Sequence, residues 1–333
     1  MPQPVTLHDV AAAAGVSIAT ASRALAGKPR VSPETVEHVL AVARKLDYRV
    51  NPIARALREG STRTVGMIVP VIGNPFFAEL IDAIEAELHL AGLELVLADS
   101  HGDLEQERRR LQTLVSRRVD GIFIVPHHEQ LSAAGILAAM SHVPIVQIDR
   151  RVEQLDTDFV GIDNERGIRS AVEHLAAVGV RTAVLASADD ENAAGRGRRA
   201  AFEAAVAEFG LTALPHLLGA FSLGSGQEAG RALLAAGALP DAVVAGSDLN
   251  AFGIISALRQ GGVRVPEDVL VTGFDGTTLS EVFDPALTTV RQPTAEIAAT
   301  AVAFLTRRMA DSDEPVRSQV VRPELVVRES TTR

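Results

Sequence analysis

The sequence predicts an α/β protein with two doubly wound parallel-sheet lobes, preceded by an all-α helix-turn-helix headpiece. Two observations predict this fold class. From Thr64 onward, short runs of β-branched residues alternate with amphipathic helical stretches, which is the pattern of parallel βαβ units. Before that point, residues 6–25 have the caps, glycine and apolar spacing of two short helices joined by a tight turn.

The first two helices are indicated by their capping residues and their turn. Thr6 is placed to cap the first helix, with Asp9 as the reciprocal acid of a capping box. Gly15 supplies the left-handed backbone conformation that a tight turn requires, and Ser17 caps the second helix. A second helix presented in this way can lie in a DNA major groove, although a plain αα-hairpin has the same local pattern. Helical spacing places Val10, Ala21 and Leu25 inside and Ile18, Ala19 and Ser22 outside.

A third helix is expected to begin at Ser32-Pro33-Glu34. Serine is a good N-cap, proline suits the first helical position and glutamate complements the helix dipole. The helix should run to about Leu46, and Tyr48, the chain's single tyrosine, should close a three-helix core. The apolar face of this helix is expected to consist of Val36, Val39, Leu40, Ala43 and Leu46.

Residues 49–62 differ in character from the helices before them. Asn51-Pro52 indicates a helix start and Gly60 a helix end. The helix between them has only about eight residues, which is too short to be stable alone. Because Ile53, Ala54 and Leu57 have few burial partners, the segment is either a plain linker or a hinge that folds only against DNA and a partner hinge.

The rest of the chain contains more βαβ units than one sheet comfortably holds, so a division near Asp163-Asn164 is expected. The candidate strands are Val65–Val69, Leu93–Ala98, Gly121–Val125, Ile145–Ile148, Phe159–Ile162, Ala183–Ala186, Val243–Gly246 and Val269–Gly273. The candidate helices between them are Phe77–Ala91, Glu105–Arg117, Gly167–Val178, Ala200–Phe209 and Leu249–Gln260.

Charge separates a basic head from an acidic body. The chain of 333 residues has a net charge of −10, yet residues 1–63 hold nine Lys/Arg and five Asp/Glu. A basic segment of this kind suits binding to the phosphates of a nucleic acid. Because its excess positive charge is modest, one copy should bind DNA weakly, which implies that two copies bind together. The absence of cysteine, of a signal-peptide profile and of a membrane-length apolar run suits a cytoplasmic protein without a membrane partner.

Three apparent enzyme motifs fail on their context. Residues 195–200 match the dinucleotide fingerprint G-x-G-x-x-G/A, but they begin well after their strand and carry arginines at small positions. His127 and His128 are adjacent and therefore point apart, with no acidic ligand at helical spacing. Ser222 and Ser225 lie in a Gly-rich loop without a nucleophile elbow. We therefore expect no enzyme, no catalytic residue, no cofactor and no metal.

Polar and aromatic residues follow several of the expected strands. Ligands of doubly wound sheets bind beyond the carboxyl ends of the strands. Carboxylates, arginine and asparagine beside aromatic faces suit a polyol, although each of these residues alone also suits a helix cap or a surface turn. The residues expected at this cleft are Asn74, Phe76, Phe77, Asp149, Arg150, Phe221, Asp248, Asn250 and Asp275.

Along its whole length the chain resembles the LacI/GalR family of transcriptional regulators. The resemblance is carried by residues 16–27, 31–35 and 47–57 near the N-terminus, and by Val65–Pro70, Asn74–Glu79, Asp120-Gly121, Gly273–Asp275 and Leu287–Gln292 in the core. It implies a DNA-binding domain over residues 1–48, a hinge helix over 49–62 and a periplasmic-binding-protein-like effector and dimerisation core over 63–333. Within that core it implies an N-lobe of about 63–162 plus 292–320 and a C-lobe of about 163–291 plus 321–333.

The resemblance also implies roles for individual residues. In a dimer on a pseudo-palindromic operator, Ile18 and Ala19 would read bases, and Leu57 would wedge into the minor groove. Ile18 and Ala19 offer no side-chain hydrogen bonds, so specificity would depend more on the hinge and on DNA shape. Arg198 is placed at the effector together with Asp149 and Asp275. The expected DNA contacts are Thr6, Ser17, Ile18, Ala19, Thr20, Ser22, Arg23, Arg30, Asn51, Ala54 and Leu57.

These features favour a homodimeric repressor of carbohydrate-metabolism genes, controlled by a sugar or sugar derivative bound between the lobes. No leucine heptad follows Glu324–Arg328, so the tetramer-forming tail of some family members is not expected. The alternatives are a two-lobed sugar-binding transport protein, a regulator with a purine or sugar phosphate as corepressor, and a nucleotide-dependent enzyme. The choice between a neutral sugar and an anion stays open, because Arg150, Arg196 and Arg198 can meet a sugar phosphate or a sugar acid. Induction and corepression both stay open as well.

Overall fold

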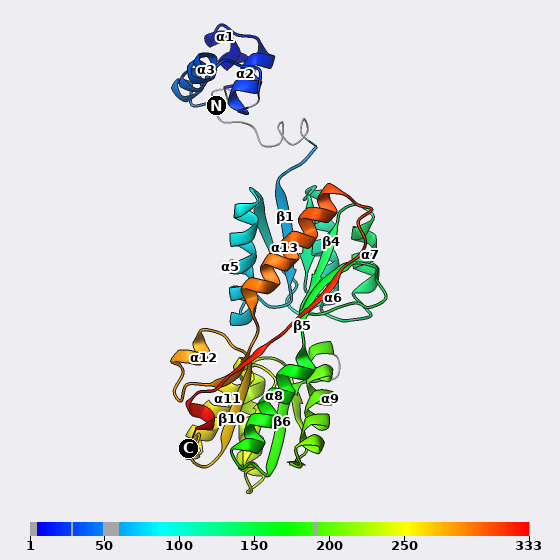
Figure 1. Ribbon diagram of the computed structural model, residues 1–333, viewed down its shortest axis with the longest axis vertical. Helices are drawn as coiled ribbons and strands as arrows, with labels where there is room; N and C mark the ends of the chain where they lie inside the picture. The colour runs from blue at the N-terminus through cyan, green and yellow to red at the C-terminus, as the bar shows by residue number, and fades with distance from the viewer. Residues whose placement is uncertain (1–4, 28, 49–59, 190–191, 333) are drawn as a thin grey trace. The chain divides into compact units, whose positions relative to one another are not determined.

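The computed structural model describes residues 5–27, 29–48, 60–189 and 192–332. The chain forms two compact units, residues 1–62 and 63–333, which are described separately (Figure 1). Asn51, Ala54 and Leu57, and with them the expected hinge helix, lie outside the described residues.

The N-terminal unit contains the helices α1 (Leu7–Ala13), α2 (Ile18–Leu25) and α3 (Pro33–Lys45). The expected capping box is present, since the Thr6 amide donates to the Asp9 carboxylate at 2.8 Å and the Asp9 amide donates to Thr6 Oγ1 at 3.4 Å. The hydrogen bonds from Thr6 lower the pKa of Asp9. Gly15 has the expected positive φ of 66°, so local sequence signals place both helix starts and the turn.

A small apolar core holds these three helices together. Val10, Ala21 and Val39 are fully buried, and Tyr48 packs against this cluster as expected. The prediction for α3 is wrong at Leu40, which is 38% exposed, whereas Val42 packs against the core instead. The apolar face of α3 therefore includes Val42 in place of Leu40, and the other predicted positions pack in the core.

The first lobe of the larger unit is built on a six-stranded sheet with the order β12-β5-β4-β3-β1-β2. All of its paired strands are parallel. Helix α5 packs beside α13, and α6 packs beside α7. Its strands are β1 (Thr64–Val69), β2 (Glu94–Asp99), β3 (Gly121–Ile124), β4 (Ile145–Ile148), β5 (Asp158–Ile162) and β12 (Ser318–Val321). Its helices are α5 (Pro75–Leu90), α6 (Leu104–Ser116), α7 (Ala133–Met140) and α13 (Thr294–Ala310).

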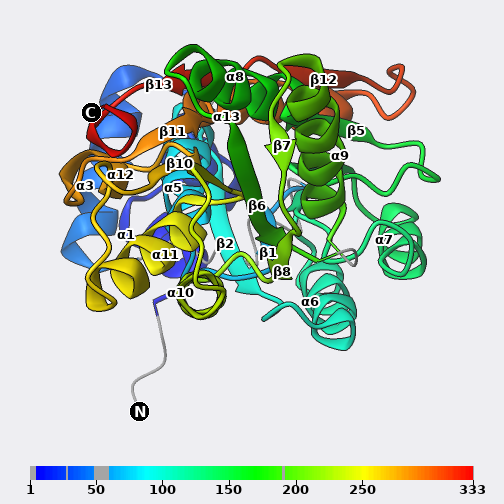
Figure 2. The ribbon, with the colours of Figure 1, turned by 90° about the horizontal axis from the view of Figure 1, so that it is seen from below.

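The second lobe has a seven-stranded sheet with the path β13-β11-β10-β9-β6-β7, and β8 pairs with β6. Helices α8 and α9 pack together, as do α10 and α11, on either side of this sheet (Figure 2). Its strands are β6 (Thr182–Ala188), β7 (Thr212–Ala213), β8 (Leu217–Gly219), β9 (Ala242–Ala245), β10 (Leu270–Asp275), β11 (Thr288–Arg291) and β13 (Glu324–Val326). Its helices are α8 (Asn164–Ala177), α9 (Ala193–Glu208), α10 (Leu223–Ala235), α11 (Asp248–Gln260), the short α12 (Leu279–Val282) and the 3₁₀ turn η1 (Glu329–Thr331).

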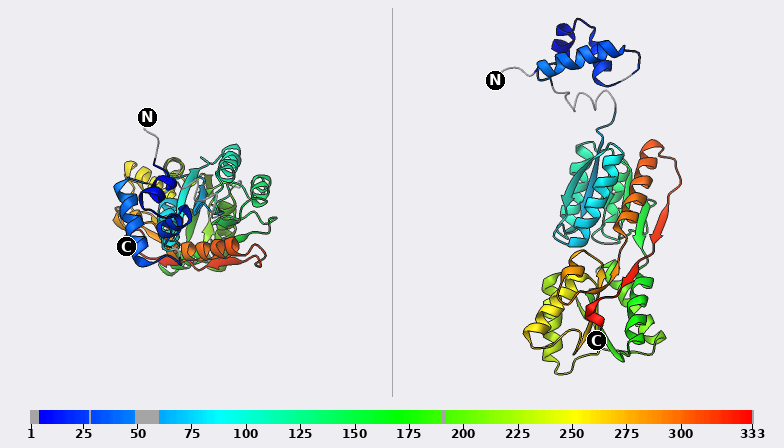
Figure 3. Two further views of the ribbon diagram at one scale, coloured as in Figure 1. Left: turned by 90° about the horizontal axis from the view of Figure 1, so that it is seen from above. Right: turned by 60° about the vertical axis from the view of Figure 1, so that its left-hand side comes forward.

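The chain crosses between the lobes after β5, after β11 and after β12 (Figures 1 and 3). The parallel pairing puts the carboxyl ends of the central strands and the N-termini of the following helices at one edge of each sheet. The fold class predicted from the sequence is confirmed. In the described ranges, no helix is long and apolar enough to cross a membrane.

Two segments interpreted as loops are the first turns of helices. Helix α9 begins at Ala193 rather than Ala200, and a Cβ at Gly195 would lie 2.7 Å from the carbonyl oxygen of Ala188. Gly195 is thus a close approach of helix to strand, not a nucleotide-binding turn. Ser222 caps α10, and Ser225 belongs to that helix rather than to a Gly-rich loop.

Candidate effector pocket and DNA-reading surface

The outer face of α2 presents the side chains expected to meet DNA. Ile18 is 50% exposed at the first position of the helix. The cap that fixes this helix start is formed by Ser17, whose hydroxyl accepts from the Thr20 amide at 3.1 Å. Arg23 and Arg30 are exposed nearby in sequence, and Ala19 is exposed as well. Thr6 differs from these residues, because its hydroxyl donates to Asp9 at 2.7 Å within its own capping box.

A pocket of about 660 Å³ lies at the carboxyl ends of the strands, with lining residues from both lobes. Four of the expected effector residues line it: Asn74, Phe77, Arg150 and Phe221. Asn74 caps α5 and holds the Phe76 amide at 3.0 Å through its side-chain oxygen. A pocket of this size accommodates a small metabolite.

Phe76 is not among the side chains that line the pocket, contrary to expectation. Phe76 and Phe77 are both 3% exposed and belong to the same apolar cluster, but only Phe77 lines the pocket. Successive residues of a helix point in directions about 100° apart, so Phe76 and Phe77 cannot both face the same cavity. The pocket therefore receives one ring from α5 and a second, Phe221, from the segment before α10.

Asp248 and Asn250 also lie behind the pocket rather than on it. Asp248 is 1% exposed, and its carboxylate accepts from the Thr277 amide at 2.8 Å and from the Thr289 hydroxyl at 2.6 Å. Burial raises the pKa of Asp248 to about 6 despite these hydrogen bonds. The Asn250 side chain donates to the Ala220 carbonyl at 2.8 Å and thereby holds the segment that carries Phe221. Both residues position the walls of the pocket.

Arg198 is buried among acceptors of its own lobe. Its Nε donates to Asn164 Oδ1 at 2.8 Å and its Nη1 to the Gly246 carbonyl at 2.5 Å. The guanidinium carbon stacks 3.6 Å from the centre of the Phe274 ring. Asp275 lies 3.9 Å away and also accepts from Gln292 at 2.8 Å. Burial raises the pKa of Asp275 well above its ordinary value, although Arg198 opposes the shift.

Arg150 lies in the first lobe with a different environment. Its side chain is 9% exposed, and its nearest acid is Asp149, with 3.6 Å between Nε and the carboxylate. Its Nε is buried without a hydrogen-bond partner. Glu107, the next acid, is 2% exposed and accepts from the His127 amide at 2.7 Å. Burial lowers the pKa of Arg150 and raises that of Glu107.

Sequence reasoning missed several lining residues. His127 follows β3, Asp189 follows β6 and Asn192 caps α9, so all three lie where the strand-end rule applies. The strand-end rule includes His127, although the adjacent pair His127-His128 also has the appearance of a metal-binding motif. Within the described ranges, no group of three or more His, Asp or Glu side chains could hold a metal ion.

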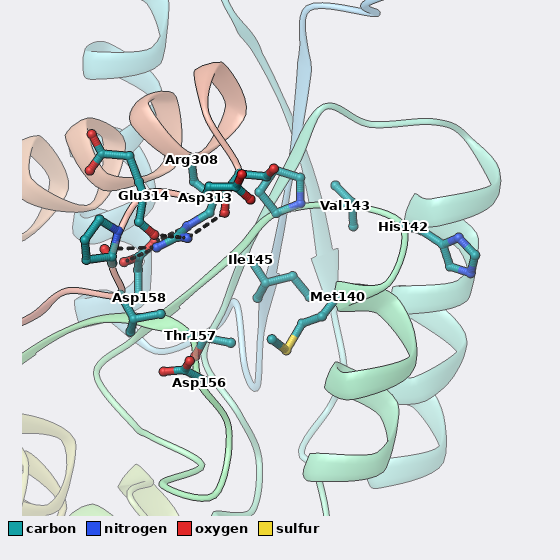
Figure 4. A pocket seen from close by; sticks show the side chains of 14 residues that line it. Met140, His142, Val143, Ile145, Asp156, Thr157, Asp158, Arg308, Asp313 and Glu314 are labelled. Atoms are coloured by element: carbon teal, nitrogen blue, oxygen red, sulfur yellow. Dashed lines mark hydrogen bonds and ion pairs between the residues drawn. The ribbon is translucent and has the colours of Figure 1, made fainter.

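A second pocket of about 660 Å³ lies in the first lobe, at the amino ends of β4 and β5 (Figure 4). Its polar wall is organised by Arg308 of α13. The guanidinium donates to both oxygens of Asp158, at 2.9 and 3.1 Å, and to the Ser312 carbonyl at 3.1 Å. Asp158 also accepts from the Arg317 amide at 2.8 Å, so these charges join α13 and β12 to the sheet.

A helix-turn-helix unit followed by a two-lobed core with a pocket at its strand ends defines a DNA-binding transcriptional regulator with an effector domain. Comparison with known proteins agrees. Residues 6–51 match the family described as bacterial regulatory proteins, lacI family, and residues 172–331 match the periplasmic binding protein-like domain.

The chain is similar to characterised relatives over nearly its full length. It is 34% identical to the HTH-type transcriptional repressor PurR of Photobacterium profundum, over 98% of each chain. It is also 34% identical to the HTH-type transcriptional regulator DegA of Bacillus subtilis, again over 98% of each. The chain therefore belongs to the LacI family, the resemblance seen in the sequence is confirmed, and the protein is a DNA-binding regulator rather than an enzyme.

Solved structures show the same architecture. The lac repressor dimer bound to operator and the anti-inducer ONPF superposes with a TM-score of 0.90 at 28% identity, over 99% of each chain. The CelR–cellobiose complex matches with a TM-score of 0.74 at 30% identity, over 98% of this chain and 99% of that one. A LacI family regulator from Enterococcus faecium with bound ribose matches with a TM-score of 0.72 at 27% identity, over 80% and 98%.

Proposed function

We propose that this protein is a cytoplasmic homodimeric repressor of carbohydrate-metabolism genes, controlled by a sugar or sugar derivative in the pocket between its lobes. The observation that carries the proposal is the pocket itself, whose rings Phe77 and Phe221 stand beside the polar groups of Asn74 and Arg150. Aromatic faces stack on the apolar face of a sugar ring, and polar side chains bind its hydroxyls. The cellobiose and ribose complexes of similar proteins support this ligand class.

Contacts between the two lobes suggest how an effector changes their arrangement. Arg196 of α9 pairs with Glu129 of the first lobe, and the Thr278 amide donates to Glu79 of α5 at 2.8 Å. A ligand that binds one lobe arrangement better than another shifts the population toward it. A coupling of about 1–3 kcal/mol between effector and operator suffices to change occupancy, and it is reciprocal. Arg198, Asp149 and Asp275 remain the proposed groups that sense the ligand from behind the pocket wall.

In the proposed DNA complex, Ile18 and Ala19 read bases in the major groove, supported by Ser17, Thr20, Ser22, Arg23 and Arg30. Leu57, with Asn51 and Ala54, is assigned to the hinge at the operator centre. The half-exposed Ile18 at a capped helix start supports this assignment, because N-terminal residues of a recognition helix contact base edges.

A purine corepressor is the second candidate. PurR proteins from several bacteria are among the relatives at 32–34% identity, and two phenylalanine rings line the pocket. A planar base stacks on such rings as readily as a sugar does.

The test uses the full chain and a random duplex pool. Rounds of selection should enrich a pseudo-palindrome, and gel shifts with that duplex should respond to one member of a panel of sugars and purines. Ile18→Asn should weaken binding to the selected site by roughly 5- to 150-fold, since a good base contact contributes about 1–3 kcal/mol. Leu40→Asn, which alters another exposed apolar residue of the same unit, should leave binding unchanged. Enrichment of no sequence, or equal binding by both variants, would contradict the proposal.

A further inference from the structure

The guanidinium of Arg150 has no hydrogen-bond partner within the part of the chain that the structure describes. The side chain is more than nine-tenths buried, at 9% exposure, yet it lines the pocket. Its Nε is fully enclosed and unpartnered. The 3.6 Å between this nitrogen and Asp149 is longer than a hydrogen bond. Buried polar groups are paired in the great majority of cases, so an exception on a cavity wall indicates a ligand.

The acids around Arg150 are engaged elsewhere. Glu107 accepts from the His127 amide at 2.7 Å. Asp275 accepts from Gln292 and lies beside Arg198. Neither acid hydrogen-bonds the Arg150 guanidinium, which lines the cavity.

The fold adds positive potential to the same cavity. Asn74, Asn192 and Ser222 line it, and they are the N-caps of α5, α9 and α10. Leu249, the second residue of α11, lines it too. Each helix N-terminus carries a partial positive charge that favours an anion. Converging helix ends and a buried arginine without a hydrogen bond thus favour the same sign of charge, opposed among the lining residues by the carboxylate of Asp189.

We propose that the effector carries a phosphate or carboxylate group that binds the terminal nitrogens of Arg150. This inference rests on the proposed function and specifies its ligand class. The planar guanidinium matches both anions through two parallel hydrogen bonds. The remainder of the ligand packs on Phe77 and Phe221, and a cavity of about 660 Å³ holds a phosphorylated or oxidised monosaccharide.

The test compares neutral and charged forms of the same compound on the full chain. Thermal unfolding is followed at constant ionic strength with glucose, gluconate and glucose 6-phosphate, with ribose and ribose 5-phosphate, and with inorganic phosphate. We expect charged compounds to raise the Tm by several degrees and the neutral parents to raise it less. The Tm shifts with gluconate and with glucose 6-phosphate are then compared, which shows whether the site prefers a carboxylate or a phosphate.

Three variants connect the effect to Arg150. Arg150→Gln should lose the anion-dependent shift and weaken binding of the preferred anion at least tenfold in calorimetry. Arg150→Lys keeps the positive charge but lacks the planar guanidinium, and it should retain part of the Tm shift. This variant keeps the proposal testable if Arg150→Gln does not fold. Arg109→Gln removes an arginine that is 61% exposed on α6, and it should behave as the wild type.

Two outcomes would overturn the proposal. In the first, none of the anions, inorganic phosphate included, gives a shift that Arg150→Gln removes. In the second, a neutral sugar binds the wild type and Arg150→Gln equally and releases the operator, which would leave the proposed function standing. Failure of the wild type to bind any duplex would instead refute the proposed function itself.

Discussion

Arg150 and Arg198 are two buried arginines at the facing sheet edges of the two lobes, and they differ in what surrounds them. Arg198 has a side-chain oxygen, a backbone carbonyl, an aromatic face and a nearby carboxylate, all from its own lobe. Arg150 has a carboxylate at 3.6 Å and no hydrogen bond within the described ranges. An arginine that the protein itself hydrogen-bonds can act on a ligand only through the pocket wall, whereas an arginine without a hydrogen bond on that wall is available to the ligand directly.

The two lobes share one backbone feature at these positions. Asp149 follows β4 with a φ of 64°, and Asp275 ends β10 with a φ of 120°. Positive φ is uncommon for residues other than glycine, and such strain gathers at functional sites. The two strand ends are thus alike, but the arginines reach them from different elements, because Arg150 directly follows Asp149 whereas Arg198 belongs to α9.

The largest effect is expected from Arg198→Met. Removing the guanidinium leaves the Asn164 side-chain oxygen and the Gly246 carbonyl without their donor and removes the stacking on the Phe274 ring. The free energy of unfolding should fall by about 3–5 kcal/mol in urea titrations, because each buried acceptor left without its donor costs about 1–3 kcal/mol. Arg199→Met, whose neighbouring ion pair with Glu203 spans 3.9 Å, should cost less than about 1 kcal/mol. Equal losses of unfolding free energy in Arg198→Met and Arg199→Met would contradict the distinction between a buried, hydrogen-bonded arginine and a surface arginine.

Arg308 extends the comparison to another partnered arginine. Arg308→Met leaves the 2%-exposed carboxylate of Asp158 without its bidentate partner and frees the carbonyls that the guanidinium holds. We expect a loss of about 2–3 kcal/mol, less than at Arg198 because Arg308 is itself 16% exposed. Arg307→Met, on the exposed side of the same helix, is the matched control and should change stability little. A larger loss at Arg307 would show that helix propensity, not pairing, governs the effect.

The difference between the two arginines could not be predicted from sequence. The strand-end rule correctly directs attention to Asn74, Phe77, Arg150 and Phe221, because strand ends follow from local apolar runs. Whether a polar side chain faces the cavity depends on partners far along the chain. The Asp248 carboxylate accepts a hydrogen bond from Thr289, 41 residues away along the chain, and therefore does not line the pocket.

The same limit applies to the fold. Buried strands and capped helices were predictable, since their signals lie within a few residues. The edge strand β12 was not, because Ser318–Val321 pairs in register with Phe159–Ile162 and has a largely exposed face. The start of α9 was missed because Gly195 serves a contact with Ala188, which the local sequence does not reveal.

The carboxylates near Arg198 predict an effect of pH on stability. Burial raises the pKa of Asp248 from 3.8 to about 6 and raises that of Asp275 in the same direction. The folded state therefore binds more protons than the unfolded state between about pH 4 and 6, so stability falls as pH rises through this window. Between pH 4.5 and 7, Asp248 should account for about 2 kcal/mol of this fall. In urea titrations, the unfolding free energy of Asp248→Asn should therefore fall by about 2 kcal/mol less than that of the wild type between pH 4.5 and 7. Asp82 is exposed, so Asp82→Asn should match the wild type.

The smallest effect on stability is expected from Arg150→Gln, although its effect on ligand binding is the largest proposed. Its guanidinium has no hydrogen bond to lose within the described chain, and its ion pair with Asp149, at 3.6 Å, is longer than a hydrogen bond, as is the 3.9 Å pair of Arg198 with Asp275. Without ligand, the free energy of unfolding should therefore change by less than about 1 kcal/mol, against several for Arg198→Met. Parallel urea titrations of the two variants measure this contrast directly. If Arg150→Gln costs as much as Arg198→Met, then Arg150 already has the partners that make an arginine part of the scaffold, and the anion would need another site.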